Sequence, residues 1–209
     1  MQFQAMDQRN CPKCGSDVGQ QLASTRMTNC PSCGTSLFLR DDRFELAGEQ
    51  GVMHDAPSLM SLGDRLSISG RSLHIIGQAR FSYGRGWWDE FWAIDGTSYA
   101  VWISVDEGDV VVQTPLLPQD APLLPTRPAL GVVINWKSNR FVVSELETAR
   151  CEALRGTLPE IMTVGETFDF ANCSDDRGRL LSGEFWPGGQ SWSLGEWVDP
   201  FDVRQAVRQ

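Results

Sequence analysis

The sequence feature that most constrains the fold is an Asp-Gly pair between two apolar runs, at Asp95-Gly96. Asp-Gly is a strong short-range signal for a β-hairpin, because a type I′ turn needs positive φ at both central residues. If these residues form that turn, Glu90 is expected to face Val101, and Trp92 is expected to face Tyr99. The pair therefore predicts both a hairpin and its register.

This predicted hairpin is apolar on both faces, because side chains alternate across a strand. One face is expected to carry Trp88, Glu90, Trp92, Ile94, Tyr99, Val101 and Ile103. The other is expected to carry Asp89, Phe91, Ala93, Ala100 and Trp102. A strand with two apolar faces is buried on both sides, so the hairpin is expected to be central in its sheet or to line a binding surface.

The rest of the chain also consists of short apolar runs separated by turn residues. Its 209 residues include 20 glycines and 11 prolines, which favours strands and turns over long helices. We expect a mostly β protein with a Trp-rich antiparallel β domain at 59–203. Two small barrel- or sandwich-like halves, 59–115 and 130–203, would be joined by a Pro-rich connector at 115–128.

The connector contains Pro-Leu-Leu-Pro twice, seven residues apart. Proline at this density favours polyproline II and excludes a central strand. The segment could dock into an aromatic groove of a partner, or its leucines could pack on the domain as a semi-rigid connector. The second interpretation is favoured.

Two Cys-Pro-x-Cys-Gly motifs near the N-terminus predict a metal site. Fifteen residues separate the inner cysteines of the pairs, which is typical of a zinc ribbon, and the ligands would be Cys11, Cys14, Cys30 and Cys33. Four thiolates leave no open position, so one structural zinc ion is expected. Two disulfides or a redox pair are the alternatives, disfavoured in a cytoplasmic chain. The ribbon is predicted at 8–40, followed by a linker at 41–58.

Charge is unevenly distributed along the chain. Residues 1–40 carry four basic and two acidic side chains, and the remainder carries 14 basic and 25 acidic ones. Because a phosphate backbone is bound by clustered Lys and Arg, nucleic-acid binding by the body is disfavoured. With no secretory signal in the first ten residues and no apolar run that spans a membrane, a cytoplasmic location is expected.

Several segments have weaker signals. Residues 145–155 combine helical spacing with flanking strand patterns, so both assignments stay open. Residues 200–208, with Pro200 near the start, suggest a short closing helix. His54 and His74 are isolated and are interpreted as an exposed loop residue and a surface or core residue.

Two short motifs recur and suggest a pseudo-repeat. Leu62-Gly63-Asp64 is echoed by Val164-Gly165-Glu166, and Glu90-Phe91-Trp92 is echoed by Glu184-Phe185-Trp186. The glycine-to-glutamate intervals differ, at 27 and 19 residues, so chance recurrence is the alternative.

These motifs also resemble a known family. The chain is similar to the bacterial domain-of-unknown-function family numbered four-one-seven-eight. The first half of the resemblance consists of Gly63-Asp64, the strand from Gly70 to Gly77, Trp88-Asp89-Glu90-Phe91 and Val101-Trp102. The second half consists of Leu158-Pro159, Gly165-Glu166 and Leu180–Glu184. The resemblance covers roughly 59–203 and departs at Ile103, where members have leucine. It implies a β-rich domain with no established activity and an N-terminal zinc ribbon. It also implies an association with other bacterial genes that are linked with the envelope or polyamine metabolism.

The residues favour a non-catalytic binding or adaptor protein. The ribbon would dock a protein partner, and an acidic aromatic surface would bind a second partner or a cationic small molecule such as a polyamine. That surface is predicted to include Trp88, Glu90, Trp92, Tyr99, Trp102, Glu184 and Trp186. A nucleic-acid-binding zinc ribbon is the alternative function.

No catalytic residue is identified from the sequence. Glu90 and Glu184 could serve as an acid–base pair in a less favoured enzymatic reading, or each could cap a neighbouring loop. Cys151 and Cys173 lack a plausible histidine partner and are interpreted as buried inert thiols.

Overall fold

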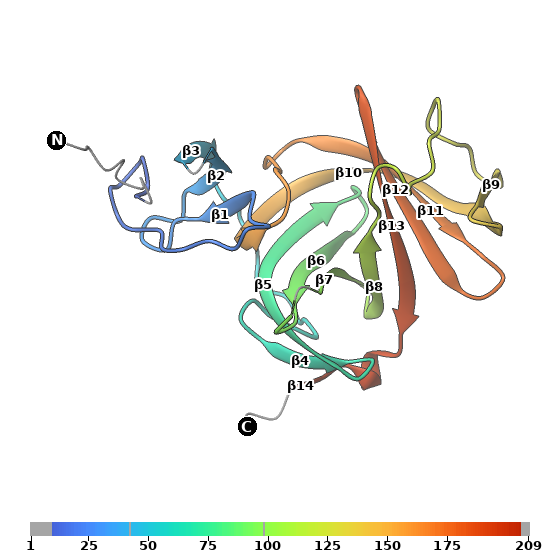
Figure 1. Ribbon diagram of the computed structural model, residues 1–209, viewed down its shortest axis with the longest axis horizontal. Helices are drawn as coiled ribbons and strands as arrows, with labels where there is room; N and C mark the ends of the chain where they lie inside the picture. The colour runs from blue at the N-terminus through green and yellow to red at the C-terminus, as the bar shows by residue number, and fades with distance from the viewer. Residues whose placement is uncertain (1–9, 42, 98, 206–209) are drawn as a thin grey trace.

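The computed structural model describes residues 10–41, 43–97 and 99–205, and nearly all regular structure in these ranges is β (Figure 1). The predicted mostly β class is confirmed. Within these ranges no helix has the length and apolar character needed to cross a bilayer.

Eight antiparallel strands form a closed barrel. Around the barrel the order is β5-β6-β7-β8-β13-β12-β11-β10, and β10 pairs with β5 to close it. The bounds are β5 Arg71–Ser82, β6 Trp87–Ile94, β7 Ala100–Asp106, β8 Asp109–Pro115, β10 Asn139–Leu158, β11 Thr167–Ser174, β12 Arg179–Trp186 and β13 Gly189–Val198. The two predicted halves correspond to β5–β8 and β10–β13, which together make this single barrel.

The central hairpin exists as β6 and β7, but its predicted register is wrong. Trp92 pairs with Trp102 and Glu90 pairs with Ser104, which is three residues away from the expected pairing. The carboxylate of Asp95 accepts hydrogen bonds from the backbone N–H groups of Thr97 and Tyr99, at 2.8 and 3.3 Å. This side-chain-bonded loop replaces the two-residue turn. An odd shift moves Tyr99, Val101 and Ile103 to the opposite face.

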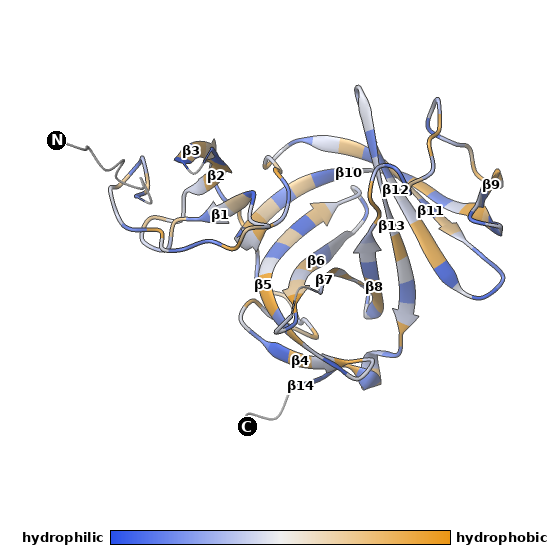
Figure 2. Ribbon diagram, in the orientation of Figure 1, coloured by the Kyte–Doolittle hydropathy of each residue, from blue (hydrophilic) through white to orange (hydrophobic). Residues whose placement is uncertain are grey.

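Both faces of the barrel strands are apolar because both are covered. Figure 2 shows apolar residues interspersed with hydrophilic ones on the barrel strands. On the outer surface, the strands β4 (Arg65–Ile68) and β14 (Arg204–Gln205) extend the sheet beside β5, and a cluster around Phe91 and Ile103 is buried there. A second outer cluster around Phe141 and Leu181 packs against Leu116 and Leu124 of the connector. Two leucines of the connector thus pack on the domain, while Leu123 is exposed.

The ambiguous segment 145–155 belongs to the long strand β10, which pairs with β11, β5 and the ribbon along its length. The predicted closing helix is wrong over the described residues. Pro200–Asp202 form a single 3-10 turn capped by Asp199, and β14 follows it; residues 206–208 lie outside the described ranges.

The ribbon is joined to the barrel by a continuous sheet. Its strands β1 (Met27–Asn29), β2 (Ser36–Arg40) and β3 (Arg43–Gly48) pair in order. β1 also pairs with the end of β10, with Met27 opposite Leu158. The ribbon sheet therefore continues beyond residue 40, into the segment predicted as linker.

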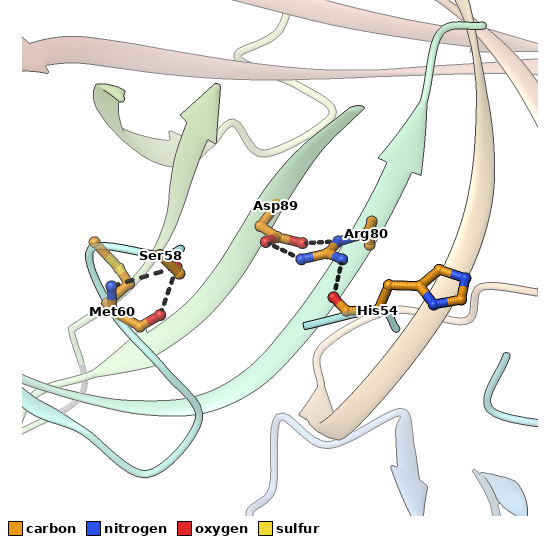
Figure 3. A network of polar contacts seen from close by, with 5 residues as sticks. All are labelled: His54, Ser58, Met60, Arg80 and Asp89. Carbon is orange, nitrogen blue, oxygen red and sulfur yellow. Dashed lines mark hydrogen bonds and ion pairs between the residues drawn. The ribbon is translucent and has the colours of Figure 1, made fainter. Parts of the chain in front are cut away.

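Residues 50–54 are held against the barrel by two arginines. Arg155 of β10 donates to the carbonyl oxygens of Gln50 and Gly51, at 2.7 and 3.1 Å. Arg80 of β5 donates to the His54 carbonyl at 2.7 Å and forms a buried two-bond ion pair with Asp89 of β6, at 2.8 Å for each bond (Figure 3). Charge-assisted bidentate bonds are strong and directional, so this segment is fixed beside the strands that close the barrel.

Candidate functional site

Four cysteines form a compact cluster in the ribbon. The sulfur atoms of Cys11, Cys14, Cys30 and Cys33 all lie within 4.8 Å of one another. Sγ of Cys11 is 3.8 Å from Sγ of Cys33, and Sγ of Cys14 is 3.6 Å from Sγ of Cys30. Sulfurs bound about 2.3 Å from a tetrahedral zinc ion lie about 3.8 Å apart, so the spacing suits a four-thiolate metal site.

The two motifs fold into matching knuckles. The N–H of Gly15 donates to the Cys11 carbonyl, and the N–H of Gly34 donates to the Cys30 carbonyl, at 2.8 and 2.9 Å. Both glycines have positive φ, 77° and 71°, a conformation that a side chain disfavours. The sequence therefore fixes each turn through its glycine.

The cysteine environments differ in solvent contact. Hydrogen bonds from Ser16 lower the pKa of Cys14 to about 6, and burial raises the pKa of Cys30 to about 11.

All six cysteines are free thiols, and the sulfur separations exceed the roughly 2.05 Å of a disulfide. The disulfide alternative is thus not the arrangement found.

A second site lies inside the barrel. A cavity of about 180 Å³ opens at the end formed by the β5–β6 and β7–β8 turns, and a smaller one of about 90 Å³ lies beyond it. Four residues line both cavities, and all are polar: Glu90, Gln113, Ser182 and Glu184. Trp102 and Glu160 line only the second.

Three carboxyl groups converge in this lumen from different elements. Glu90 of β6 accepts hydrogen bonds from the indole of Trp88 and the hydroxyl of Ser104, at 3.2 and 3.0 Å. Glu184 of β12 accepts from the Ser191 hydroxyl at 3.3 Å. Glu160, from the β10–β11 loop, lines the smaller cavity together with Trp102.

The environment of these groups favours their neutral forms. Burial raises the pKa of Glu90, and burial together with the charges of Glu160 and Glu90 raises the pKa of Glu184 well above its usual range. Burial and the charge of Glu90 raise the pKa of Glu160 to about 7. Glu160 keeps the most solvent exposure of the three, so water screens it more than the others.

The wider mouth of the lumen is also acidic. Asp106, Glu107, Asp109 and Glu145 line the larger cavity. Burial, and then these neighbouring charges, raise the pKa of Asp106. Among the described residues, no Lys, Arg or His lines either cavity. The lumen thus combines several carboxyl groups with aromatic walls, and the described part of the chain places no basic side chain in its lining.

The predicted aromatic surface is only partly assembled. Four of its members line the lumen: Trp88, Glu90, Trp102 and Glu184. The ring of Trp92 is tilted against that of Trp102, with 5.0 Å between the ring centroids. Trp186 lies outside, half-exposed beside Glu160 and Glu184 in a neighbouring groove.

Tyr99 lies on the outer face, where the guanidinium of Arg71 stacks over its ring at 4.2 Å. The register error explains its misplacement, because the predicted pairing put Tyr99 on the face of Glu90.

Sequence reasoning missed Ser104, Gln113, Ser182 and Glu160. The first three are polar residues at inward-facing positions of apolar strands, a signal that the correct register would have revealed. Glu160 lies in a loop, and no periodicity marks it.

The remaining candidate groups take no part in the lumen. The backbone of His54 is held by Arg80, and His74 is partly buried on β5, where burial lowers its pKa. Burial raises the pKa of both Cys151 and Cys173 to about 12, as expected for inert thiols.

The recurring motifs do not occupy equivalent strands. Gly63-Asp64 precedes β4, and Glu90 lies two strands later on β6, whereas Gly165-Glu166 precedes β11 and Glu184 lies on the next strand, β12. Both glutamates nevertheless face the lumen. Their convergence therefore comes from barrel closure, and the spacing of the motifs does not follow the strand order.

Fold and site together define an all-β barrel protein with an N-terminal four-cysteine cluster that could hold a metal ion. A family model described as Domain of unknown function (DUF4178) matches residues 61–200. The chain belongs to this family, as its motifs suggested. No curated protein and no solved structure matched the chain.

The raised pKa of the Glu184 carboxyl predicts a pH-dependent stability. A group whose pKa is raised by folding stabilises the fold below its unfolded pKa, and this contribution is lost as pH rises through the folded pKa. Glu184→Gln keeps the shape and cannot ionise, so it should raise the free energy of unfolding at pH 8.5 by on the order of 1–2 kcal/mol. The gain at pH 5 should be smaller.

Urea unfolding at the two pH values checks this prediction. Glu196→Gln is the matched control, because Glu196 is exposed on the outer face of the adjacent strand β13. It should leave the difference between the two pH values as in the wild type. A Glu184→Gln protein that loses stability equally at both pH values would instead indicate a structural role for this carboxylate.

Proposed function

We propose that the barrel lumen binds an organic cation. The observation that carries this proposal is the convergence of Glu90, Glu160 and Glu184 on a cavity that no described basic side chain lines. Eight-stranded barrels have lumens wide enough to hold one small ligand. Buried like charges destabilise one another, and a bound cation would remove that cost.

The walls of the lumen suit an organic cation. Trp88, Phe168 and Phe170 line the larger cavity, and aromatic faces attract cations. A metal ion is a poorer match, because among the described residues only the four cysteines form a group of three or more side chains that could hold a metal ion. A polyamine, with several charges along an apolar chain, is a ligand that this combination of carboxylates and rings would accept.

The proposal predicts that spermidine binds and that binding depends on the lumen carboxylates. Glu90→Gln and Glu184→Gln should each weaken binding by roughly tenfold or more, since a hydrogen bond to a charged group contributes about 1.5–3 kcal/mol. Binding of the wild type should strengthen from pH 6 to pH 8.5, because burial raises the pKa of the lumen carboxyl groups, that of Glu160 to about 7, and a rising pH favours their charged forms. Isothermal titration calorimetry measures both effects.

Glu196→Gln again serves as the control, with the same change in net charge on the outer surface. If it weakened binding as much as the lumen variants, the attraction would be that of the overall negative charge. Absence of heat with spermidine throughout this pH range would contradict the proposal.

For the ribbon, we propose that the metal is zinc, bound once per chain in a structural role. The four-thiolate set is typical of closed tetrahedral zinc sites. Metal analysis of the purified protein should find one zinc per chain, and Cys14→Ser should lose most of it. Cys151→Ser, a change outside the cluster, should leave the zinc content unchanged. Iron or copper in place of zinc, or a metal content unaffected by Cys14→Ser, would contradict this assignment.

We further propose that the ribbon docks a protein partner, which would make the chain an adaptor. Strand β3 is the last strand of the described sheet, with one edge unpaired, and Leu46 on it is 54% exposed. An unpaired edge accepts an added strand through main-chain hydrogen bonds.

This docking proposal predicts that Leu46→Lys abolishes capture of a partner from nuclease-treated extract of the native cell, read by mass spectrometry. Leu123→Lys is the control, because Leu123 is 87% exposed on the Pro-rich connector. Loss of the partner with Leu123→Lys, and its retention with Leu46→Lys, would shift docking from the ribbon to the connector.

A further inference from the structure

We propose that the lumen selects a cation with N–H donors, a primary alkylammonium, over a quaternary ammonium. This inference rests on the proposed cation site and names the chemistry of the headgroup that it recognises. It follows from which hydrogen-bonding groups around the carboxylates are already used and which are left without a partner.

The side-chain donors around Glu90 are already engaged. The indole of Trp88 donates to Glu90. The amide nitrogen of Gln113 donates to the Ser104 hydroxyl at 3.0 Å, and that hydroxyl donates to Glu90. The donors of this part of the lumen are therefore directed at its own acceptors.

The group left over is an acceptor. The amide oxygen of Gln113 is buried, and no group of the described residues is its hydrogen-bond partner. Gln113 is only 6% exposed, and its side chain lines both cavities. A buried polar atom without a partner costs about 1–3 kcal/mol, so a ligand that donates to it gains a contact that the empty lumen lacks.

The backbone beside Gln113 keeps its side chain in this position. Gly195 of β13 is its cross-strand neighbour, and a Cβ atom there would press against the side chains of Gln113 and Val111. Glycine at this position leaves the room that Gln113 needs to reach the lumen between Glu90 and Glu184. The available acceptors thus come from three walls, β6, β8 and β12.

A primary ammonium matches this arrangement. It carries one positive charge and three N–H donors that diverge, which lets it bond to acceptors on different walls. A trimethylammonium group carries the same charge and still stacks on aromatic rings, but it cannot donate. It would leave the Gln113 oxygen without a partner and would desolvate the carboxylates without hydrogen bonds.

Calorimetry with n-butylammonium and n-butyltrimethylammonium at pH 8.5 tests the inference. At this pH the lumen carboxyls are more fully ionised and the alkylammonium keeps its proton. The wild type should bind the primary ammonium at least about tenfold more tightly. Gln113→Met, close in size, should weaken primary ammonium binding several-fold and leave quaternary ammonium binding unchanged. Far-UV circular dichroism checks that this variant folds.

The outcomes distinguish a failure of the donor requirement from a failure of the proposed cation site. Equal affinities for the two ligands, or tighter binding of the quaternary one, would overturn the donor requirement and leave a general cation site. Binding of neither ligand, together with no binding of spermidine, would overturn the cation site itself. The comparison of two ligands on the wild type decides the question even if Gln113→Met does not fold.

Discussion

The pairing of β5 with β10 is the contact on which the rest of the structure depends, because it closes the barrel. Gly77 and Gly156 face each other across this seam. A Cβ atom on Gly77 would overlap the carbonyl oxygen of Thr157, and one on Gly156 would overlap that of Ile76. Two facing glycines therefore let the strands approach. Without this closure the lumen would be an open face, and its carboxyl groups would be hydrated.

The same seam joins the ribbon to the barrel. Beyond Gly156, β10 continues to Leu158 and pairs there with β1, while Arg80 and Arg155 hold residues 50–54 next to the closing strands. A metal ion held by the cysteine cluster would fix the ribbon, and the ribbon extends the sheet at the end of β10. Metal binding would therefore order a strand that directly contacts the closure of the barrel, which ties the two modules into one folding unit.

The sequence predicted what depends on local chemistry. The cysteine cluster followed from spacing and turn glycines, and the β class followed from short runs and turn residues. The lumen was only partly predictable, because it depends on register. The carboxylate of Asp95 bonds to Thr97 and Tyr99, and this local preference outweighed the Asp-Gly turn signal. The true register differs from the predicted one by an odd number of residues, so the two faces of β7 are exchanged. The prediction therefore did not place Ser104 in the lumen and wrongly placed Tyr99 there. Glu160 could not be found, since only the folded chain brings its loop to the lumen.

The lumen departs from the rules that the rest of the chain follows. The outer clusters around Phe91 and Phe141 are apolar and closely covered. The interior has an apolar cluster around Trp92 and Phe170 as well, but beside it lie three carboxyl groups, of which Glu160 is the most exposed, and the buried amide oxygen of Gln113. The carboxyl groups destabilise the empty protein because burial and mutual repulsion oppose their ionisation. The amide oxygen does so because it is buried without a hydrogen-bond partner among the described residues. Apolar side chains of similar volume would fill this interior without the free-energy cost of burying polar groups. Positions that break local rules without structural compensation are where function is expected, and here a donor-bearing cation would satisfy all of them at once.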